Sequence, residues 1–208
     1  MRILYLIVCC FFFSAPISIY GQENRVASLV SKHQVEIVKI REQLHQYPEL
    51  SNREVKTAQL VADHLTSLGM EVTTGIAHTG VVGILRGGKP GPVIAIRADM
   101  DALPVTEETT LPFKSTIRTT YLNKEVGVMH ACGHDIHTSV QLGVASVLSE
   151  MKADLTGTVK FIFQPAEEGA PPGEEGGAEL MVREQVLQNP APEVILGLHV
   201  LPSLKTGT

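Results

Sequence analysis

The sequence predicts an α/β fold of three layers, with helices on both faces of a central sheet. Two observations lead to this prediction. Short apolar segments alternate along the chain with longer segments whose apolar residues recur every three or four positions. The short segments are typical of buried strands, and the longer ones are typical of helices that pack on a sheet. The chain has 208 residues, of which 44% are hydrophobic, so it is long enough to bury a core of this kind.

Four segments have apolar residues at helical spacing: residues 25–46, 55–68, 138–151 and 177–187. The first should end before Pro48, because the residue that precedes a proline avoids helical backbone angles. The second follows Ser51-Asn52-Arg53-Glu54, which fits a capping box, and we expect Gly69 to end it.

Five short apolar segments are expected to form strands: residues 70–74, 81–85, 93–97, 159–163 and 194–198. A run rich in glycine and proline, residues 87–92, joins the second segment to the third and predicts a turn. Helical segments stand between several of these strands, which is typical of a sheet covered by helices.

Polar residues follow directly after four apolar segments: Asp99 and Asp101 after residues 93–97, Glu167 and Glu168 after 159–163, His199 after 194–198, and His130 after 126–129. In open α/β sheets, ligands bind in the crevice beyond the carboxyl ends of the strands. We therefore expect these carboxylates, imidazoles and one nearby thiol to share a site at that edge of the sheet.

The densest of these groups is residues 130–137, with the sequence His-Ala-Cys-Gly-His-Asp-Ile-His. Cys132 and His134 stand two positions apart, and the glycine between them permits a tight loop, so both side chains can reach one metal ion. A thiolate, imidazoles and carboxylates suit Zn²⁺, and Mn²⁺ or Co²⁺ would also fit. Asp135 or His137 could then hold a ligand ring in place. The alternative is a capped helix N-terminus whose histidines are merely exposed.

Glu167 and Glu168 follow a predicted strand, whereas the later pair Glu174 and Glu175 is expected to be solvated surface. Adjacent side chains point in different directions, so one carboxylate of the first pair can bind a metal while its neighbour faces a water molecule. Metal-assisted hydrolysis needs this combination, because the metal lowers the pKa of the water and a carboxylate takes its proton.

Five motifs occur in order along residues 35–208: His-Gln-Tyr-Pro-Glu-Leu-Ser at 45–51, Arg-Ala-Asp-Met-Asp-Ala-Leu-Pro at 97–104, Met-His-Ala-Cys-Gly-His-Asp at 129–135, Phe-Gln-Pro-Ala-Glu-Glu-Gly at 163–169 and Gly-Leu-His-Val at 197–200. Together they resemble the M20 metallopeptidase family. More narrowly, they resemble its amidohydrolase branch, which includes N-acyl-amino-acid hydrolases, hippurate hydrolases and auxin-conjugate hydrolases.

This resemblance implies a two-metal centre, occupied by zinc or manganese, with four ligands in this chain: Cys132, His134, Glu168 and His199. It implies that Glu167 is the general base and acid, and that Asp101 has a supporting role beside the metals. It also implies that the substrate is a small molecule, an N-acyl amino acid or a similar acyl conjugate, whose amide bond is cleaved. His45 matches only a signature near the start, and we expect no catalytic role for it.

Members of this family are longer than this chain. They have a smaller lid or dimerisation domain inserted in the catalytic domain, followed by a last histidine ligand that no residue here matches. We therefore expect residues 22–208 to be the N-terminal part of a catalytic domain, and the full-length form to be a homodimer. Two alternatives stay open: an M20-type exopeptidase or dipeptidase, and a non-catalytic metal-binding fragment.

Residues 1–21 have the layout of a secretory signal, with Arg2, an apolar run to Phe13 and small residues up to Gly21. The apolar run is shorter than the roughly 20 residues that span a membrane. We therefore expect export, to the periplasm or the medium, with an uncleaved anchor as the alternative. The net charge of −5, without a run of Lys or Arg, argues against a nucleic acid as partner.

Overall fold

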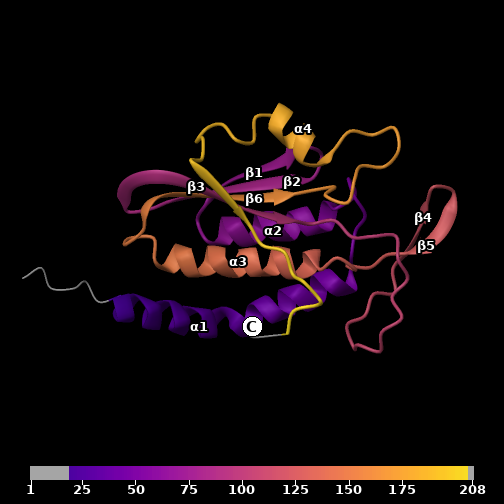
Figure 1. Cartoon of the computed structure of the whole chain (residues 1–208), viewed down its shortest axis with the longest axis horizontal. Coiled ribbons are helices and arrows are strands. Elements are labelled where there is room, and N and C mark those ends of the chain that lie inside the picture. Colours follow the sequence, from indigo (N-terminus) through magenta and orange to yellow (C-terminus); the bar gives the residue numbers. More distant parts are fainter. Residues whose placement is uncertain (1–18, 206–208) are drawn as a thin grey trace, which may run out of the picture.

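The computed structural model describes residues 19–205 and shows a mixed sheet with helices on both faces (Figure 1). Five strands form the sheet, in the spatial order β1-β2-β6-β3-β7: β1 (Glu71–Ile76), β2 (Gly80–Arg86), β3 (Lys89–Asp99), β6 (Thr156–Gln164) and β7 (Val194–Gly197). The helices are α1 (Ile19–Gln46), α2 (Val55–Ser67), α3 (His134–Glu150) and α4 (Gly177–Arg183). The predicted α/β architecture is confirmed.

Three neighbouring strands of the sheet run in the same direction. β3 is parallel to both β6 and β7, and Arg97 of β3 lies opposite Ile162 of β6 and Gly197 of β7. On the other side, β2 is antiparallel to β6 and β1 is antiparallel to β2. The register of the three parallel strands places their carboxyl ends side by side at one edge of the sheet.

The core lies on both faces of the sheet, because successive side chains of a strand point in opposite directions. Phe161 and Phe163 of β6 are fully buried on the face covered by α2 and α3. Burial of each ring stabilises the fold by roughly 1.5–3 kcal/mol. Ile162 points to the other face, where it packs with Met181 of α4. α1 packs mainly on α3 and forms an outer layer (Figure 1).

The four residues before α2 do not form the expected capping box, because the side chains of Ser51 and Glu54 make hydrogen bonds to other parts of the chain. Glu49 caps the helix instead. Its carboxylate oxygens accept hydrogen bonds from the N–H groups of Lys56 and Thr57 at 3.2 and 2.8 Å. The first turn of α2 therefore obtains its acceptor from outside the four-residue motif.

A small second sheet was not predicted. It consists of β4 (Arg118–Tyr121) and β5 (Lys124–Gly127) and projects from the side of the domain (Figure 1). Its strands carry mainly charged and hydroxyl side chains, and β5 contains only the first two residues of the apolar segment 126–129. Residues 126–129 therefore do not extend the central sheet. Val126 and Gly127 pair with β4, and Met129 forms an isolated bridge with Leu103, which lies beyond the end of β3.

The ends of three helices also differ from the prediction. α3 begins at His134 rather than at residue 138, and α4 ends at Arg183 rather than at residue 187. α1 begins at Ile19. Most of the predicted secretory signal, residues 1–18, lies outside the described residues, so the signal stays a prediction. Among residues 19–205, no helix has the length and apolar character needed to cross a membrane.

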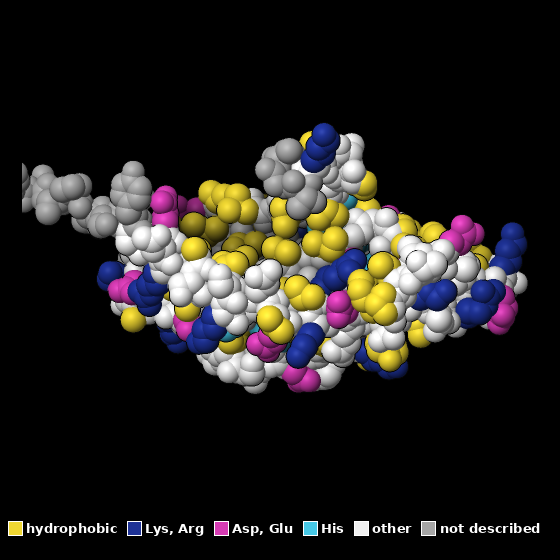
Figure 2. All heavy atoms as spheres, turned by 90° about the horizontal axis from the view of Figure 1, so that it is seen from below, with side chains coloured by type: hydrophobic (Ala, Val, Ile, Leu, Met, Phe, Trp, Pro, Cys, Tyr) yellow, Lys and Arg dark blue, Asp and Glu magenta, His cyan; other side chains and the backbone are white. Residues whose placement is uncertain are grey.

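Exposed apolar side chains gather in a hollow on the face seen from below (Figure 2). A groove of about 410 Å³ between α1 and α3 is lined by apolar residues that include Val30, Ile37 and Val144. The edge strand β7 exposes its valine, isoleucine and leucine side chains as well. α1 and the segment from β7 to Leu204 carry most of the exposed large hydrophobic side chains of the described residues.

A buried network of charges joins α1 to the start of α3. His45 lies between two carboxylates, with Nδ1 2.9 Å from Asp135 Oδ2 and Nε2 3.2 Å from Glu107 Oε1. Arg41 Nε lies 2.9 Å from the same oxygen of Asp135. The hydrogen bond to Asp135 raises the pKa of His45, opposed by burial and assisted by Glu107. The imidazolium form of His45 is therefore favoured by the fold.

We expect the stabilisation provided by His45 to decrease as the pH rises. A histidine whose pKa is raised by folding stabilises the protein fully below its ordinary value of 6.5, and loses this contribution as the pH rises through the folded-state pKa. Urea denaturation without added metal, between about pH 6 and 9, should show a steeper fall in the free energy of unfolding for the wild type than for His45→Gln. His78→Gln, which removes an exposed histidine, should follow the wild type. Parallel curves for the wild type and His45→Gln would contradict this role.

Candidate metal centre

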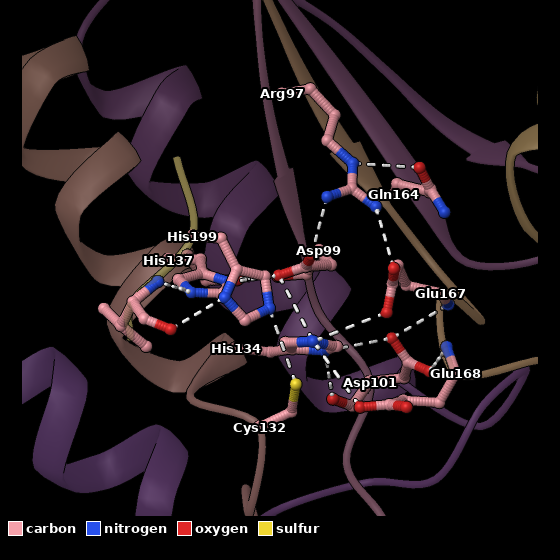
Figure 3. A network of polar contacts seen from close by, with 12 residues as sticks. Arg97, Asp99, Asp101, Cys132, His134, His137, Gln164, Glu167, Glu168 and His199 are labelled. Atoms are coloured by element: carbon pink, nitrogen blue, oxygen red, sulfur yellow. Dashed lines mark hydrogen bonds and ion pairs between the residues drawn. The ribbon is translucent and has the colours of Figure 1, made fainter. Parts of the chain in front are cut away.

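Polar side chains converge where the three parallel strands end (Figure 3). They come from four segments: Arg97, Asp99 and Asp101 at the end of β3, Cys132 and His134 at the start of α3, Glu167 and Glu168 after β6, and His199 after β7. All six residues predicted for the site are among them. The register of the parallel strands, together with the start of α3, brings these segments to one place.

His134 is buried at the centre of the site, and one of its ring nitrogens is free. Nδ1 lies 2.8 Å from the main-chain oxygen of Asp101, which can only accept, so Nδ1 carries the proton. Nε2 is buried and has no hydrogen-bond partner among the described residues. It lies 3.6 Å from Glu167 Oε2 and 3.7 Å from Glu168 Oε1. A buried nitrogen lone pair that faces two carboxylates is suited to a cation placed between them.

Cys132 and His199 face each other, with 3.5 Å between Sγ and Nε2. His199 Nδ1 donates to the main-chain oxygen of Val200 at 2.7 Å, which leaves Nε2 with its lone pair toward the sulfur. Gly133 has a φ of +87°, and a Cβ there would lie 2.4 Å from Val200 Cγ2, so only glycine suits this loop. Burial and the nearby charge of Glu168 raise the pKa of the Cys132 thiol to about 11. Metal binding would therefore have to displace a proton.

Asp101 holds the turn that carries the two glutamates. Its buried carboxylate accepts hydrogen bonds from the N–H groups of Glu167 and Glu168, at 3.0 Å each, and from the hydroxyl of Ser51 at 2.8 Å. Burial opposes the ionisation of Asp101, but these bonds and the contact with His134 keep its pKa below the ordinary value. Asp101 therefore stays ionised and fixes the directions in which both glutamate side chains leave the backbone.

Asp99 and His137 connect β3 to the segment that carries His199. Asp99 is fully buried, and its Oδ1 accepts a hydrogen bond from His137 Nδ1 at 2.6 Å. His137 Nε2 in turn accepts a hydrogen bond from the N–H of Val200 at 2.9 Å. His137 thus holds the backbone next to His199, a predicted ligand, and does not hold the ring of a ligand. Asp135 does not hold a ligand ring either, because it belongs to the charge network that joins α1 to α3.

Among residues 19–205, three groups of possible ligand atoms lie within 4.8 Å of one another: Cys132, His134 and His199; Asp99, His134 and His137; and His134, Glu167 and Glu168. The second group is not available to a metal ion, because both ring nitrogens of His137 already take part in hydrogen bonds, to Asp99 and to the N–H of Val200. In the first and third groups, atoms that could bind a metal ion are not used up by hydrogen bonds, and both groups include His134. Burial opposes a positive charge on His134, but Asp101, Asp99 and Glu168 raise its pKa, so the site attracts cations.

The histidines of residues 130–137 and the glutamates that follow the site differ in their exposure to solvent. The alternative for residues 130–137, a capped helix N-terminus with exposed histidines, is wrong, because all three histidines are buried and no side chain caps α3. Glu174 and Glu175 are exposed, as expected. Arg53 nevertheless binds the carboxylate of Glu174 with hydrogen bonds of 3.0 and 2.5 Å, which lower its pKa to about 2. This ion pair fastens the loop that follows the two site glutamates.

Known proteins share both the sequence and the fold of this chain. A family model described as peptidase family M20/M25/M40 matches residues 95–208, which include all six predicted site residues. Thermostable carboxypeptidase 1 of Saccharolobus solfataricus is 45% identical over 172 residues, covering 82% of this chain and 40% of that protein. The N-acyl-L-amino acid amidohydrolase of Geobacillus stearothermophilus is 42% identical over 185 residues, covering 89% of this chain and 46% of that protein.

A solved structure shows the same arrangement of elements. The Bacillus subtilis YXEP protein, described as a dinuclear metal binding peptidase from the M20 family, is 40% identical and aligns with a TM-score of 0.71. The alignment covers 86% of this chain and 45% of that chain. This chain thus spans less than half the length of each of these relatives.

Proposed function

Because this chain belongs to peptidase family M20/M25/M40, we propose that it is part of a metal-dependent amidohydrolase. The enzyme cleaves the amide bond of N-acyl amino acids or similar small acyl conjugates. The observation that carries the proposal is Nε2 of His134, which is buried and unpartnered beside two carboxylates. The 42% identity to an N-acyl-L-amino acid amidohydrolase supports the substrate class. The proposal concerns the whole protein, of which residues 22–208 would be the N-terminal part of the catalytic domain.

The donor set fits two divalent ions. Cys132, His134 and His199 offer a thiolate and two imidazoles close to one another, and Glu168 adds a carboxylate beside His134. The description of the YXEP protein as dinuclear supports the number of ions. The sulfur and nitrogen donors suit zinc, and the carboxylates also suit manganese. When bound, such ions act as Lewis acids that lower the pKa of a water molecule and polarise the substrate carbonyl.

Glu167 is the residue that we assign to proton transfer. Its side chain is more exposed than that of Glu168, at 35% against 23%, so it faces the space open to water and substrate. Asp101 fixes its backbone, and Arg97 lies 4.0 Å from Oε1. From this position the carboxylate can accept a proton from the attacking water and deliver it to the leaving nitrogen.

A second candidate is an exopeptidase, favoured by the 45% identity to a carboxypeptidase. The two substrate classes share their reacting group, because a C-terminal peptide bond and an N-acyl amino acid both place an amide next to a free carboxylate. The same metal centre and the same proton transfer would serve either substrate. What separates them is the group on the acyl side, so the assay must vary that group.

We expect the full-length protein to hydrolyse hippurate and N-acetyl amino acids faster than dipeptides when it is loaded with zinc or manganese. Removal of the metal with a chelator should abolish turnover, and adding either ion back should restore it. Metal content and product formation are measured on the same samples. Faster cleavage of dipeptides would favour the exopeptidase. A protein that holds two metals and cleaves neither substrate class would contradict the proposal.

A further inference from the structure

Glu54 is a buried carboxyl group whose contacts point toward the metal centre. It is fully buried at the start of α2. Oε2 accepts a hydrogen bond from the Thr79 hydroxyl at 2.6 Å, and Oε1 accepts one from the N–H of Ala166 at 2.8 Å. Burial raises the pKa of Glu54. A carboxyl group in such a place is costly unless its hydrogen bonds do something that an apolar side chain could not.

Capping of the helix does not explain this position. Glu49 accepts hydrogen bonds from the N–H groups of Lys56 and Thr57 in the first turn of α2, and the side chain of Glu54 makes no capping hydrogen bond. Glu54 is thereby free to turn away from its own helix toward Ala166, which lies 112 positions later in the chain.

Ala166 begins the turn that presents the two site glutamates. Its φ is +49°, a left-handed backbone conformation that residues other than glycine rarely adopt without support. Its main-chain oxygen accepts a hydrogen bond from the N–H of Gly169 at 3.3 Å, so Glu167 and Glu168 are the two central residues of a β-turn. A disfavoured backbone conformation thus stands immediately before the reacting carboxylate.

Three successive N–H groups of this turn are bound by two buried carboxyl groups. Ala166 donates to Glu54, while Glu167 and Glu168 donate to Asp101 at 3.0 Å each. The two acceptors come from different elements, the start of α2 and the end of β3. Asp101 binds the two central N–H groups of the turn but not the N–H of Ala166, its first residue. Glu54 supplies the acceptor for that N–H group, so both carboxyl groups together set the orientation of the turn.

We propose that Glu54 is a positioning residue of the metal centre, which holds Ala166 in its left-handed conformation and so directs the side chains of Glu167 and Glu168 toward His134. The proposal rests on the proposed function in one respect, namely that Glu167 transfers the proton. Glu54 itself touches neither metal nor substrate. It acts through the backbone of the turn.

Three variants of the full-length, metal-loaded protein test this inference. Glu54→Ala removes the acceptor of the Ala166 N–H. Glu54→Gln keeps the length of the side chain and an oxygen for Ala166. Thr79→Val is the matched control, because it removes the hydrogen bond to the other oxygen of Glu54 and leaves the turn untouched.

We expect kcat to fall by about 10–100-fold in Glu54→Ala, with KM changed less than about threefold. Glu54→Gln should restore kcat to within about fivefold of the wild type, and Thr79→Val should stay within about threefold even though its melting temperature falls. Hydrogen exchange at the Ala166 amide should be faster in Glu54→Ala alone. If kcat instead falls in Thr79→Val as far as in Glu54→Ala, or does not fall in Glu54→Ala, Glu54 has only a structural role.

A replacement variant and a second measurement cover the cases in which Glu54→Ala does not fold or the protein shows no activity. If Glu54→Ala does not fold, Glu54→Asp replaces it, because the shorter side chain cannot reach Thr79 and Ala166 together. If the unsubstituted protein hydrolyses no acyl amino acid, the proposed function is wrong. The positioning role is then judged by Co²⁺ titration, in which Glu54→Ala must weaken binding by about tenfold or more and Glu54→Gln must not. Equal Co²⁺ affinity in both variants would overturn it.

Discussion

Replacement of Glu167 by glutamine is expected to lower kcat by about 10²–10⁴-fold, the usual contribution of a positioned general base. Glutamine has nearly the same shape, and Asp101 would still bind the N–H of residue 167. The predicted ligands Cys132, His134 and Glu168 are left in place, so metal content should stay close to that of the wild type. Turnover of hippurate by the full-length protein and metal content by atomic absorption measure the two quantities.

Glu168→Gln is the matched control, because it changes the adjacent position by the same chemical step. It removes a charged oxygen that lies 3.7 Å from His134 Nε2, so metal affinity should fall and activity should fall as a consequence. Excess metal should partly restore Glu168→Gln and should not restore Glu167→Gln. If Glu167→Gln lost its metal while Glu168→Gln kept it, the two roles would be reversed. If neither change mattered, the hydrolytic mechanism would be wrong.

Replacement of Asp101 by asparagine should lower both metal affinity and kcat, each by about 10–100-fold. The carboxylate uses its two oxygens to accept from Glu167 and Glu168 at once, whereas asparagine offers one oxygen and one NH₂ group. The NH₂ group would face an N–H of the turn, so one of the two glutamates would be displaced. Competition with a fluorescent chelator measures the affinity, and steady-state kinetics on the full-length protein measure kcat.

Ser51→Ala is the control for this prediction, because it deletes a hydrogen bond to Asp101 and leaves the carboxylate in place. We expect it to change metal affinity and kcat by less than about threefold. Equal losses in Ser51→Ala and Asp101→Asn would show that general destabilisation causes them. An Asp101→Asn variant with the affinity and kcat of the wild type would exclude the supporting role of Asp101.

Periodic patterns were sufficient to find the elements that carry the site. β2, β6 and β7 lie where the apolar segments predict them. β2 and β6 are buried in the covered sheet, which requires a continuous run of apolar side chains, whereas the edge strand β7 has such a run although its side chains are exposed. β4 and β5 were missed because they lie outside that sheet and carry polar side chains. The six predicted site residues were found differently, from polar residues that follow strands and from five motifs that resemble a known family.

The sequence alone establishes the positions of the strands and helices that carry the site, the polar residues at their ends and the family motifs. These features depend on residues that are close together in the chain. The partners of the buried polar groups depend on packing. Cys132 meets His199 across 67 positions, and Glu54 meets Ala166 across 112. Ser51 and Glu54 fit a local capping box, yet both serve the distant turn and its acceptor Asp101. A buried carboxyl group must be hydrogen-bonded, and only the folded chain determines which donors are left unpaired within its reach.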